Sequence, residues 1–420
     1  MEKIKYVIEN IVYRIKLYFH YVVAYYYILR NRNKVRKKIT NGEVLNCIFI
    51  IQYIPSWGKL EPVYLKMKND SRFNPIILCV PLNIQNHILM DDKGNDTYDY
   101  FIDNGYEAIN ALNSDGSWYD LHKLNPDYVF HSRPYNSYLP ECYTSYNIVK
   151  YSLICNILYG MCITNNLIPV TINRGYFCDV YCYFAFDKYE IDYFKRLLFL
   201  GCKLGIKTSL PYGSTSLEQI LVNKVEKKKN EFTKTILWTP RWSTDKKIGG
   251  SNFFNYKDIL LKFAKEHPNI KLILRPHPLM LNNFIETGEM TKDEVEAFKE
   301  YCRTENNLIL DEEKEYNQTF WNSDILITDV SSIVPEYFIT KHPIIYCHSN
   351  INYQYTNFAR DMIHSCYEVY NESELITSLS KLIFDKDEKE QLRIQCIDSY
   401  FNNLENNSGN IVDFLAAKSA

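Results

Sequence analysis

The sequence predicts an α/β protein made of two Rossmann-like domains, each built on a parallel sheet, with a basic and aromatic helix at the N-terminus. Short apolar segments alternate with helical ones in two successive series, and a polar, lysine-rich stretch at 210–232 separates the two series. The 420 residues are enough for two or three domains of ordinary size, and a hydrophobic content of 46% supplies their cores. We expect the two domains to face a cleft, with ligands bound beyond the carboxyl ends of the strands.

Residues 1–42 form the predicted N-terminal segment. The first 40 residues contain ten Lys and Arg against two Glu, a balance of +8 in a chain whose net charge is −2. The uncharged run LYFHYVVAYYYIL at 17–29 is too short to cross a bilayer, which takes about 20 residues. Cations follow this run where a signal peptide would have its cleavage site. The pattern favours a helix at an anionic membrane surface, where each cation adds ~1 kcal/mol. The alternative is a helix packed on its own protein or on a partner.

Residues 43–212 are the predicted N-terminal Rossmann-like domain. Its apolar runs and the helical segments between them are typical of a parallel sheet with helices on both faces. Strands are expected at 47–54, at 75–80 and within 125–135, where the strand ends at His131, and helices are expected at 60–69 and 106–113.

Residues 213–386 are the predicted C-terminal, nucleotide-binding domain, and residues 387–420 are predicted to add helices after it. The Lys227–Lys229 run is typical of a solvated linker or helix face. Strands are expected at 235–240, 271–274, 307–310, 325–328 and 343–347, and helices near 256–266 and 292–303.

Composition and motifs exclude several classes of protein. The twelve cysteines form no CxxC pair and no metal-like cluster with histidine, which fits a reducing cytoplasm. The sequence contains no HExxH, GxSxG, Walker or GxGxxG motif. The nearly balanced net charge does not indicate a nucleic-acid partner. We therefore expect neither a metal site nor a nucleic-acid site.

The segment SDILITDVSSIVPEYF at 323–338 predicts a strand, a tight turn and a helix N-terminus in immediate succession. Ser331 and Ser332 are favourable N-cap residues, and Pro335 is tolerated only in the first turn of a helix. Free backbone N–H groups and the positive end of the helix dipole make such a turn an anion site. The alternative is an ordinary helix cap.

Two other strand ends of the same domain are also polar. Arg275 and His277 follow the strand at 271–274 in the sequence LRPHP, and Arg241 follows the strand at 235–240 in TPRWS. An Arg and a His side by side can hold a diphosphate, the Arg by its fork and the His as hydrogen-bond or proton donor. In isolation, Arg275 could equally be an ion-pair partner in a rigid surface turn.

TPRWS, LRPHP and SDILITDVSSIVPEYF followed by KHPIIYC resemble, in order and spacing, the C-terminal half of the CDP-glycerol glycerophosphotransferase family. The resemblance is specific over about 210–350, while VFHSRPYNSYLP and LICNILYG resemble the acceptor-side domain of a divergent branch. It implies a GT-B fold and the synthesis of teichoic-acid-type polymers. It also implies that Arg275, His277, Ser331 and Ser332 contact the cytidine diphosphate, that Asp329 shapes the turn and that Glu336 reaches the ribose.

The sequence departs from the family at the catalytic base. Family members resemble one another in an HGTP-like motif whose histidine is the base, and no such tetrapeptide occurs here. The best-placed substitute is His131, for which a packed or capping role is equally open. Asp179 is a carboxylate alternative, and His87 and His122 are weaker candidates.

These observations predict a peripheral enzyme at the cytoplasmic face of a bacterial inner membrane. It would move glycerol phosphate from CDP-glycerol to a hydroxyl of a lipid-linked glycan or polymer, in teichoic-acid-like or capsular polymer synthesis. The alternatives are a GT-B glycosyltransferase, a CDP-ribitol ribitolphosphotransferase and a non-catalytic membrane-recruited scaffold. No Asp-rich metal motif is present, so we expect protein groups to neutralise the phosphate charge, with a divalent cation left open.

Overall fold

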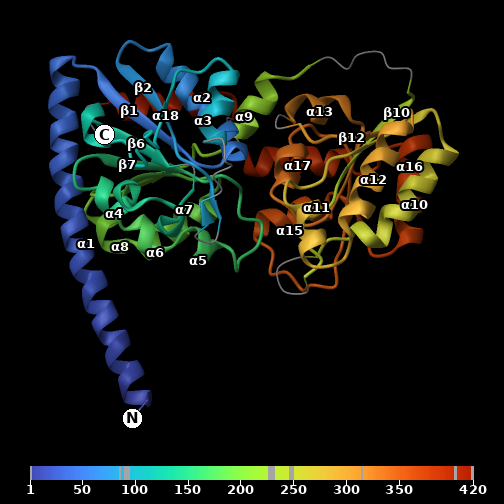
Figure 1. The fold of residues 1–420 in the computed structure, drawn as a ribbon, viewed down its shortest axis with the longest axis horizontal. Helices are drawn as coiled ribbons and strands as arrows, with labels where there is room; N and C mark the ends of the chain where they lie inside the picture. The colour runs from blue at the N-terminus through green and yellow to red at the C-terminus, as the bar shows by residue number, and fades with distance from the viewer. Residues whose placement is uncertain are drawn as a thin grey trace. The chain divides into compact units, whose positions relative to one another are not determined.

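The computed structural model describes residues 2–84, 87–88, 95–131, 133–225, 232–245, 250–313, 316–401 and 404–417. Side chains are described from residue 17 onward, apart from those of 83–84 and 87–88. The chain forms two compact units (Figure 1), the first comprising Met1–Gly160, Ile168–Glu218 and Leu404–Ala420, and the second Met161–Leu167 and Gln219–Asn403. Residues 161–167, expected in the N-terminal domain, therefore belong to the second unit, which the chain re-enters at Gln219, a few residues beyond the expected boundary. The expected C-terminal segment is divided between the units.

A seven-stranded parallel sheet lies at the centre of the first unit, in the order β5-β2-β1-β6-β7-β8-β9. Its central strands β6, β7 and β8 are buried along their whole length, as a parallel sheet covered on both faces requires. The main elements of this unit are α1 Glu2–Asn41, β1 Leu45–Ile51, α2 Trp57–Lys68, β2 Phe73–Cys79, β3 Asn83–Ile84, β4 His87–Ile88, α3 Asp96–Asp103, β5 Ala108–Asn110, β6 Tyr128–His131, α4 Ser145–Ile148, β7 Leu153–Ile157, α5 Ile168–Thr171, α6 Arg174–Phe177, β8 Val180–Phe184, α7 Lys188–Leu197, α8 Phe199–Lys203, β9 Thr208–Leu210, α9 Thr215–Val222 (which runs into the second unit) and α18 Asn407–Ala416.

The prediction of a helix at 106–113 is wrong. Ala108–Asn110 form β5, an edge strand parallel to β2. The neighbouring helix is α3, which begins where the side chain of Asn95 accepts a hydrogen bond of 3.3 Å from the backbone N–H of Tyr98. Eight residues are too few to separate helical from strand periodicity, so pairing with β2 decides the conformation of this segment.

Helix α1 confirms the predicted N-terminal helix and packs one of its faces against the first unit. Asn31 on this face donates from Nδ2 to the carbonyl oxygen of Val149 at 2.8 Å. Near the end of the helix, Lys38 Nζ lies 2.7 Å from the buried carboxylate of Asp127. The contact face repeats every three or four positions, as an amphipathic helix requires, with Ala24, Ile28, Asn31 and Val35 fully buried.

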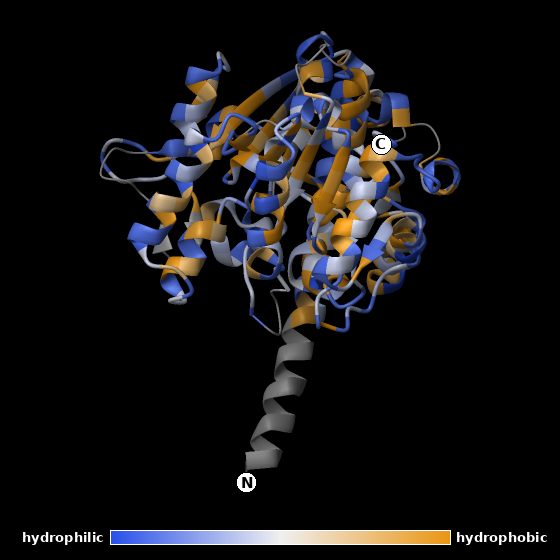
Figure 2. Ribbon diagram, turned by 90° about the vertical axis from the view of Figure 1, so that its right-hand side faces the viewer, coloured by the Kyte–Doolittle hydropathy of each residue, from blue (hydrophilic) through white to orange (hydrophobic). Residues whose placement is uncertain are grey.

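A six-stranded parallel sheet lies at the centre of the second unit, in the order β12-β11-β10-β13-β14-β15. Figure 2 shows hydrophobic strands in the interior, with more polar helices around them. All five strands expected in this domain are present. The elements are β10 Lys234–Thr239, α10 Phe253–Glu266, β11 Ile270–Leu274, α11 Met280–Glu286, α12 Lys292–Thr304, β12 Leu308–Leu310, α13 Asn317–Asn322, β13 Ile325–Thr328, α14 Ile333–Phe338, β14 Ile344–Cys347, α15 Asn357–His364, β15 Tyr367–Val369, α16 Glu372–Phe384 and α17 Glu390–Tyr400.

The core of the second unit fixes β10 and α10 to each other. The rings of Trp238 on β10 and Phe253 on α10 stack with centroids 5.5 Å apart, and both side chains are buried. Burial of each such side chain contributes about 1.5–3 kcal/mol. This packing sets the position of the start of α10 relative to β10.

Candidate functional site

Three neighbouring strands of the second unit end beside one another. β11, β10 and β13 are adjacent and parallel, so the segments that follow them leave the sheet at the same edge. The hydroxyl groups of Thr239 and Thr328, the last residues of β10 and β13, are hydrogen-bonded at 2.8 Å. The topology therefore brings to one edge the turns that carry the six residues predicted there: Arg241, Arg275, His277, Asp329, Ser331 and Ser332.

Asp329 is a buried carboxylate that joins two segments of this edge. Its Oδ2 accepts hydrogen bonds from the backbone N–H groups of Arg241 at 2.9 Å and Asn252 at 3.1 Å, and its Oδ1 accepts one from the side-chain amide of Asn252 at 2.8 Å. Burial raises the pKa of Asp329 to about 6, and these hydrogen bonds oppose the rise. The carboxylate thus holds the turn after β10 and the start of α10 against the end of β13.

His277 and Arg241 lie close enough to interact electrostatically. Burial, and after it the positive charge of Arg241, lowers the pKa of His277 to about 4, so its imidazole is neutral at pH 7. His277 Nδ1 accepts a hydrogen bond of 3.2 Å from the backbone N–H of Leu279, which places the ring proton on Nε2. A guanidinium and a neutral N–H donor side by side suit an anionic group, and a bound anion would raise the pKa of His277.

Arg275 is engaged in an ion pair. Its Nη1 lies 2.8 Å from Oδ2 of Asp311, and both side chains are nearly buried. The guanidinium also donates to the carbonyl oxygen of Glu313 and lies over the ring of Tyr316, 5.3 Å from the centroid. This geometry favours the ion-pair interpretation, while a contact of Arg275 with the donor remains a prediction.

The serine turn begins the short helix α14 as expected, with Pro335 in the first turn. Ser331 Oγ accepts a hydrogen bond of 3.3 Å from the backbone N–H of Ile333. Ser332 occupies the N-cap position, but its exposed side chain makes no capping hydrogen bond. Capping therefore accounts for Ser331 and leaves Ser332 unexplained.

Glu336, predicted to reach a ribose, lies buried on α14. Its Oε2 accepts a hydrogen bond of 2.6 Å from the hydroxyl of Tyr316. Because the ring of Tyr316 also packs under the guanidinium of Arg275, this contact couples the ends of β11 and β13. The contact with a ribose remains a prediction.

Three further residues of this edge were missed by the sequence analysis: Asn252, Gly250 and Tyr353. Gly250 has a φ of +94°, and a Cβ there would lie 2.6 Å from the hydroxyl of Tyr353, so only glycine fits. Burial raises the pKa of Tyr353 and the charge of Arg241 opposes this rise, which places the phenol near the guanidinium. The pattern GGSN before FF could have indicated a helix start at Asn252, whereas Tyr353 carried no local signal.

His131 ends β6, as predicted, but lies in the core of the first unit. Its Nδ1 accepts from the hydroxyl of Tyr176 at 2.8 Å, and its Nε2 donates to the carbonyl oxygen of Tyr143 at 3.1 Å. Burial lowers the pKa of His131 to about 4. Both ring nitrogens are therefore occupied in the interior, which favours the packed histidine and gives the predicted catalytic base no support.

The other candidates for the base also contact groups of the protein, or their side chains lie outside the described residues. The buried carboxylate of Asp179 contacts His20 and Ser145, at 2.9 and 2.7 Å. The ring of His122 packs on Tyr151, with centroids 3.9 Å apart. The side chain of His87 lies outside the described residues.

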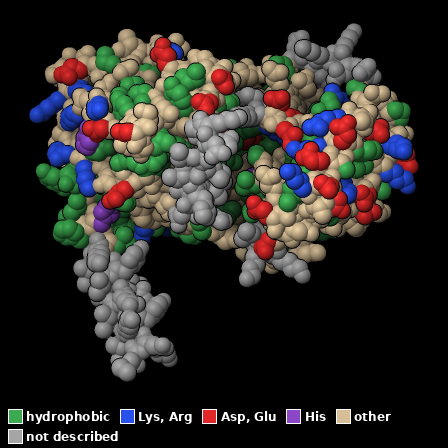
Figure 3. Space-filling view, viewed as in Figure 1, with side chains coloured by type: hydrophobic (Ala, Val, Ile, Leu, Met, Phe, Trp, Pro, Cys, Tyr) green, Lys and Arg blue, Asp and Glu red, His purple; other side chains and the backbone are tan. Residues whose placement is uncertain are grey.

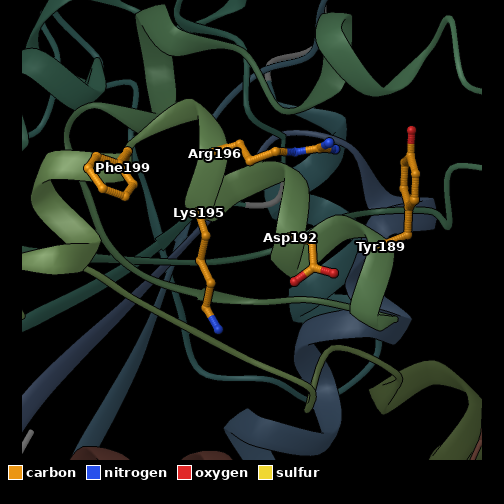
Figure 4. A pocket seen from close by; sticks show the side chains of 5 residues that line it. All are labelled: Tyr189, Asp192, Lys195, Arg196 and Phe199. Carbon is orange, nitrogen blue, oxygen red and sulfur yellow. The ribbon is translucent and has the colours of Figure 1, made fainter.

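A shallow pocket of about 420 Å³ lies on the first unit beside α7. Figure 4 shows its lining side chains, among which Lys195 and Arg196 point in different directions. The lining residues are Tyr189, Asp192, Lys195, Arg196 and Phe199. None of the predicted site residues is among them, so this pocket is separate from the candidate site.

Several solved structures share the fold. The wall teichoic acid polymerase TagF, soaked with CDPG, matches 97% of this chain and 98% of its own at 15% identity and a TM-score of 0.53. UDP-GlcNAc 2-epimerase from Neisseria meningitidis, bound to UDP-GlcNAc, matches 88% and 99% at 15% identity and a TM-score of 0.57. S. aureus MnaA with UDP matches 89% and 96% at 14% identity and a TM-score of 0.56. These matches confirm the GT-B-like α/β fold class.

A protein-family model matches the part of the chain that contains the second unit's sheet. Residues 218–416 match the model of the CDP-glycerol:poly(glycerophosphate) glycerophosphotransferase family, a little under half of the chain. The match includes the sheet of the second unit and every residue predicted there, and it confirms the resemblance that the motifs indicated. No curated protein sequence is significantly similar to the chain. Among the helices of the described residues, none combines the length and hydropathy that crossing a bilayer requires.

Proposed function

We propose that the protein transfers glycerol phosphate from CDP-glycerol to a hydroxyl of a lipid-linked glycan or polymer, in teichoic-acid-like or capsular polymer synthesis. The observation that carries this proposal is the arrangement of Arg241, His277 and the Ser331–Ser332 turn at three adjacent strand ends within the family match. A cation, a neutral N–H donor and hydroxyl groups on one sheet edge meet the requirements of a diphosphate.

In the proposed reaction, the acceptor hydroxyl attacks the β-phosphorus of CDP-glycerol. A new phosphorus–oxygen bond forms to the acceptor, the bond to the CMP oxygen breaks, and the hydroxyl proton passes to a base. Such transfer depends on positioning and charge neutralisation more than on covalent chemistry. Arg241 would neutralise the departing CMP phosphate, and Nε2–H of His277 would hydrogen-bond to it. The base is unassigned, since His131 and Asp179 are both held in the core; a divalent cation remains an alternative source of positive charge.

The exposed face of α1 supports a peripheral position at an anionic membrane, which we propose to be the cytoplasmic face of the inner membrane. Opposite the packed face, the first part of the described helix exposes large apolar side chains, and cations follow at its end. Figure 3, viewed as Figure 1, shows Lys and Arg side chains near hydrophobic ones at the left-hand side, where α1 lies. The apolar residues are Tyr18, Phe19, Val22, Tyr26 and Leu29, between 43% and 72% exposed.

The cations at the end of α1 line a groove of about 540 Å³. Its lining residues are Arg30, Asn33, Lys34, Lys37, Lys38, Asn41 and Glu43. Apolar rings beside cations suit the interface of an anionic bilayer.

The test is a donor panel assayed for the released nucleotide. Purified full-length protein, anionic vesicles and a lipid-linked acceptor are incubated with CDP-glycerol, CDP-ribitol or UDP-GlcNAc. We expect CMP release from CDP-glycerol, because transfer of a phosphoalditol leaves a nucleoside monophosphate. Release of UDP from UDP-GlcNAc alone would make the protein a glycosyltransferase. Release of CMP from CDP-ribitol alone would identify CDP-ribitol as the donor. Failure to bind any cytidine nucleotide by calorimetry would favour the scaffold.

A further inference from the structure

A histidine, a cysteine and a carboxylate meet where α1 packs against the first unit. His20 Nε2 lies 2.9 Å from Asp179 Oδ1, although 159 positions separate the two residues in the chain. The ligand atoms of His20, Cys178 and Asp179 all lie within 4.8 Å of one another. Cys178 and Asp179 are buried, while 33% of the His20 side chain is exposed, so solvent reaches the cluster from the helix side. No metal site was expected from the sequence, because His20 lies far from Cys178 and Asp179 in the chain.

The carboxylate is held by outer partners, as carboxylates that bind metals usually are. Asp179 Oδ2 accepts a hydrogen bond of 2.7 Å from the hydroxyl of Ser145. The side-chain amide of Asn136 donates to the same hydroxyl at 2.8 Å. These contacts occupy one oxygen of Asp179 and leave the other directed at His20.

A buried hydroxyl group beside the cluster lacks a partner. Tyr21 Oη is inaccessible to solvent and makes no hydrogen bond within the described part of the chain. Tyr21 directly follows His20 on α1, and its phenol interacts electrostatically with Cys178. An unpaired buried hydroxyl is costly, and a water molecule bound to a metal ion would supply its partner.

The charges around the cluster limit the kind of ion. Lys207 Nζ donates to the carbonyl oxygens of Cys178 and Val180, each at 2.6 Å, and adds a positive charge nearby. An ion there needs anionic ligands: Asp179 provides one, and loss of the Cys178 proton provides a second. Thiolate, imidazole and carboxylate together are the ligands of zinc.

We propose that His20, Cys178 and Asp179 bind one Zn²⁺-class transition-metal ion, with water in the fourth position, and that the ion fastens α1 to the first unit. Binding displaces the proton in the hydrogen bond between His20 Nε2 and Asp179 and the thiol proton of Cys178, and both protons pass to solvent. No electron transfer or further reactant is involved. The inference does not depend on the transferase activity proposed above.

The test uses the full-length protein, freed of metal with a chelator and then dialysed. Zn²⁺ is titrated by calorimetry, and Co²⁺ serves as a spectroscopic probe because a cysteine thiolate gives a sulfur-to-cobalt charge-transfer band. We expect one equivalent of each ion and a higher melting temperature with Zn²⁺. Cys178→Ser should abolish the band and weaken Zn²⁺ binding by roughly 100-fold or more, and Ser145→Ala by about 10-fold.

Cys202→Ser is the matched control, since this partly buried cysteine of α8 lies in the same unit but outside the cluster. It should leave the band and the affinity unchanged. Cys178→Ser is preferred to a His20 variant because it keeps the contact between His20 and Asp179. No stoichiometric binding to the wild type, or equal Zn²⁺ affinity in wild type and Cys178→Ser, would overturn the proposal.

Discussion

The carboxylate of Asp329 accepts a hydrogen bond of 2.9 Å from the backbone N–H of Arg241. The first residue after β13 therefore fixes the turn after β10, where the guanidinium lies beside His277. Asp329 is a positioning residue in the proposed site, because its own carboxylate is buried and occupied by these donors.

Asp329→Asn should lower the affinity for CDP-glycerol by about tenfold, measured by calorimetry. The asparagine amide presents N–H groups where an oxygen now accepts, so at least one backbone donor loses its partner, and hydrogen bonds to a charged group are worth about 1.5–3 kcal/mol. Asp324→Asn is the matched control. Asp324 accepts a hydrogen bond of 2.7 Å from the backbone N–H of Thr235, and this contact joins the amino ends of the same two strands, β13 and β10. Equal losses in both variants would indicate general loosening of the sheet.

His277→Ala should reduce kcat more than donor affinity, by about 10²–10⁴-fold, if the imidazole acts on the departing phosphate. Since the pKa of His277 is about 4, the imidazole is already neutral above pH 5, and kcat/KM should show no ionisation of this residue between about pH 5 and 8. His267→Ala is a control, because His267 lies at the end of α10 and stacks on Phe263. Proportional losses in rate and affinity would make His277 a simple binding group.

Arg275→Ala and Arg241→Ala should fail in different ways. Removing Arg275 leaves Asp311 as an uncompensated, nearly buried charge, so we expect a loss of about 3 kcal/mol in unfolding free energy. Removing Arg241 should weaken CDP-glycerol binding with a smaller change in stability. Melting temperature and calorimetry on both variants separate the two effects. A stable Arg275→Ala protein that no longer binds the donor would restore Arg275 as a ligand.

Replacing Ser331 and Ser332 together by glycine should preserve the melting temperature and weaken CDP-glycerol binding by tenfold or more. Glycine is a tolerable N-cap and costs only a few tenths of a kcal/mol, whereas each lost charge-assisted hydrogen bond costs roughly 1.5–3 kcal/mol. Thr291→Gly tests the capping effect alone, because Thr291 forms the capping box of α12 with Glu294. Normal kinetics in a folded double variant would reduce the turn to a helix cap.

Replacing Phe19, Val22 and Tyr26 by serine should release the protein from anionic vesicles, with a drop in partitioning of about tenfold or more. These side chains are 60–72% exposed, so the fold does not depend on them. Sedimentation with vesicles measures the effect, and activity on a soluble acceptor should persist. The control replaces Phe199, Leu200 and Leu204, which are 57–62% exposed on or beside α8 of the same unit. Unchanged sedimentation of the first variant would reject the interfacial role of α1.

The sequence by itself determined the two series of strands, the N-terminal helix and the polar strand ends of the second unit. Each rests on local information: apolar runs long enough to be buried, turn and cap residues beside them, and Arg, His and Ser where a strand stops. Because the carboxyl ends of parallel strands meet at one edge, the rule that places ligands there also predicted that Arg241, His277 and Asp329 would converge.

Only the tertiary structure decided which of these polar groups are already engaged. The pairing of β5 with β2 overrode the helical expectation at 106–113, and the packing of Tyr176 and Tyr143 turned His131 into a core residue. In the same way Asp311 forms an ion pair with Arg275, and the packing of α1 places His20 beside Asp179, 159 positions away in the chain. The reason is physical: burial, hydrogen-bond partners and charge pairing depend on residues far apart in the sequence, and folding alone brings those residues within contact distance.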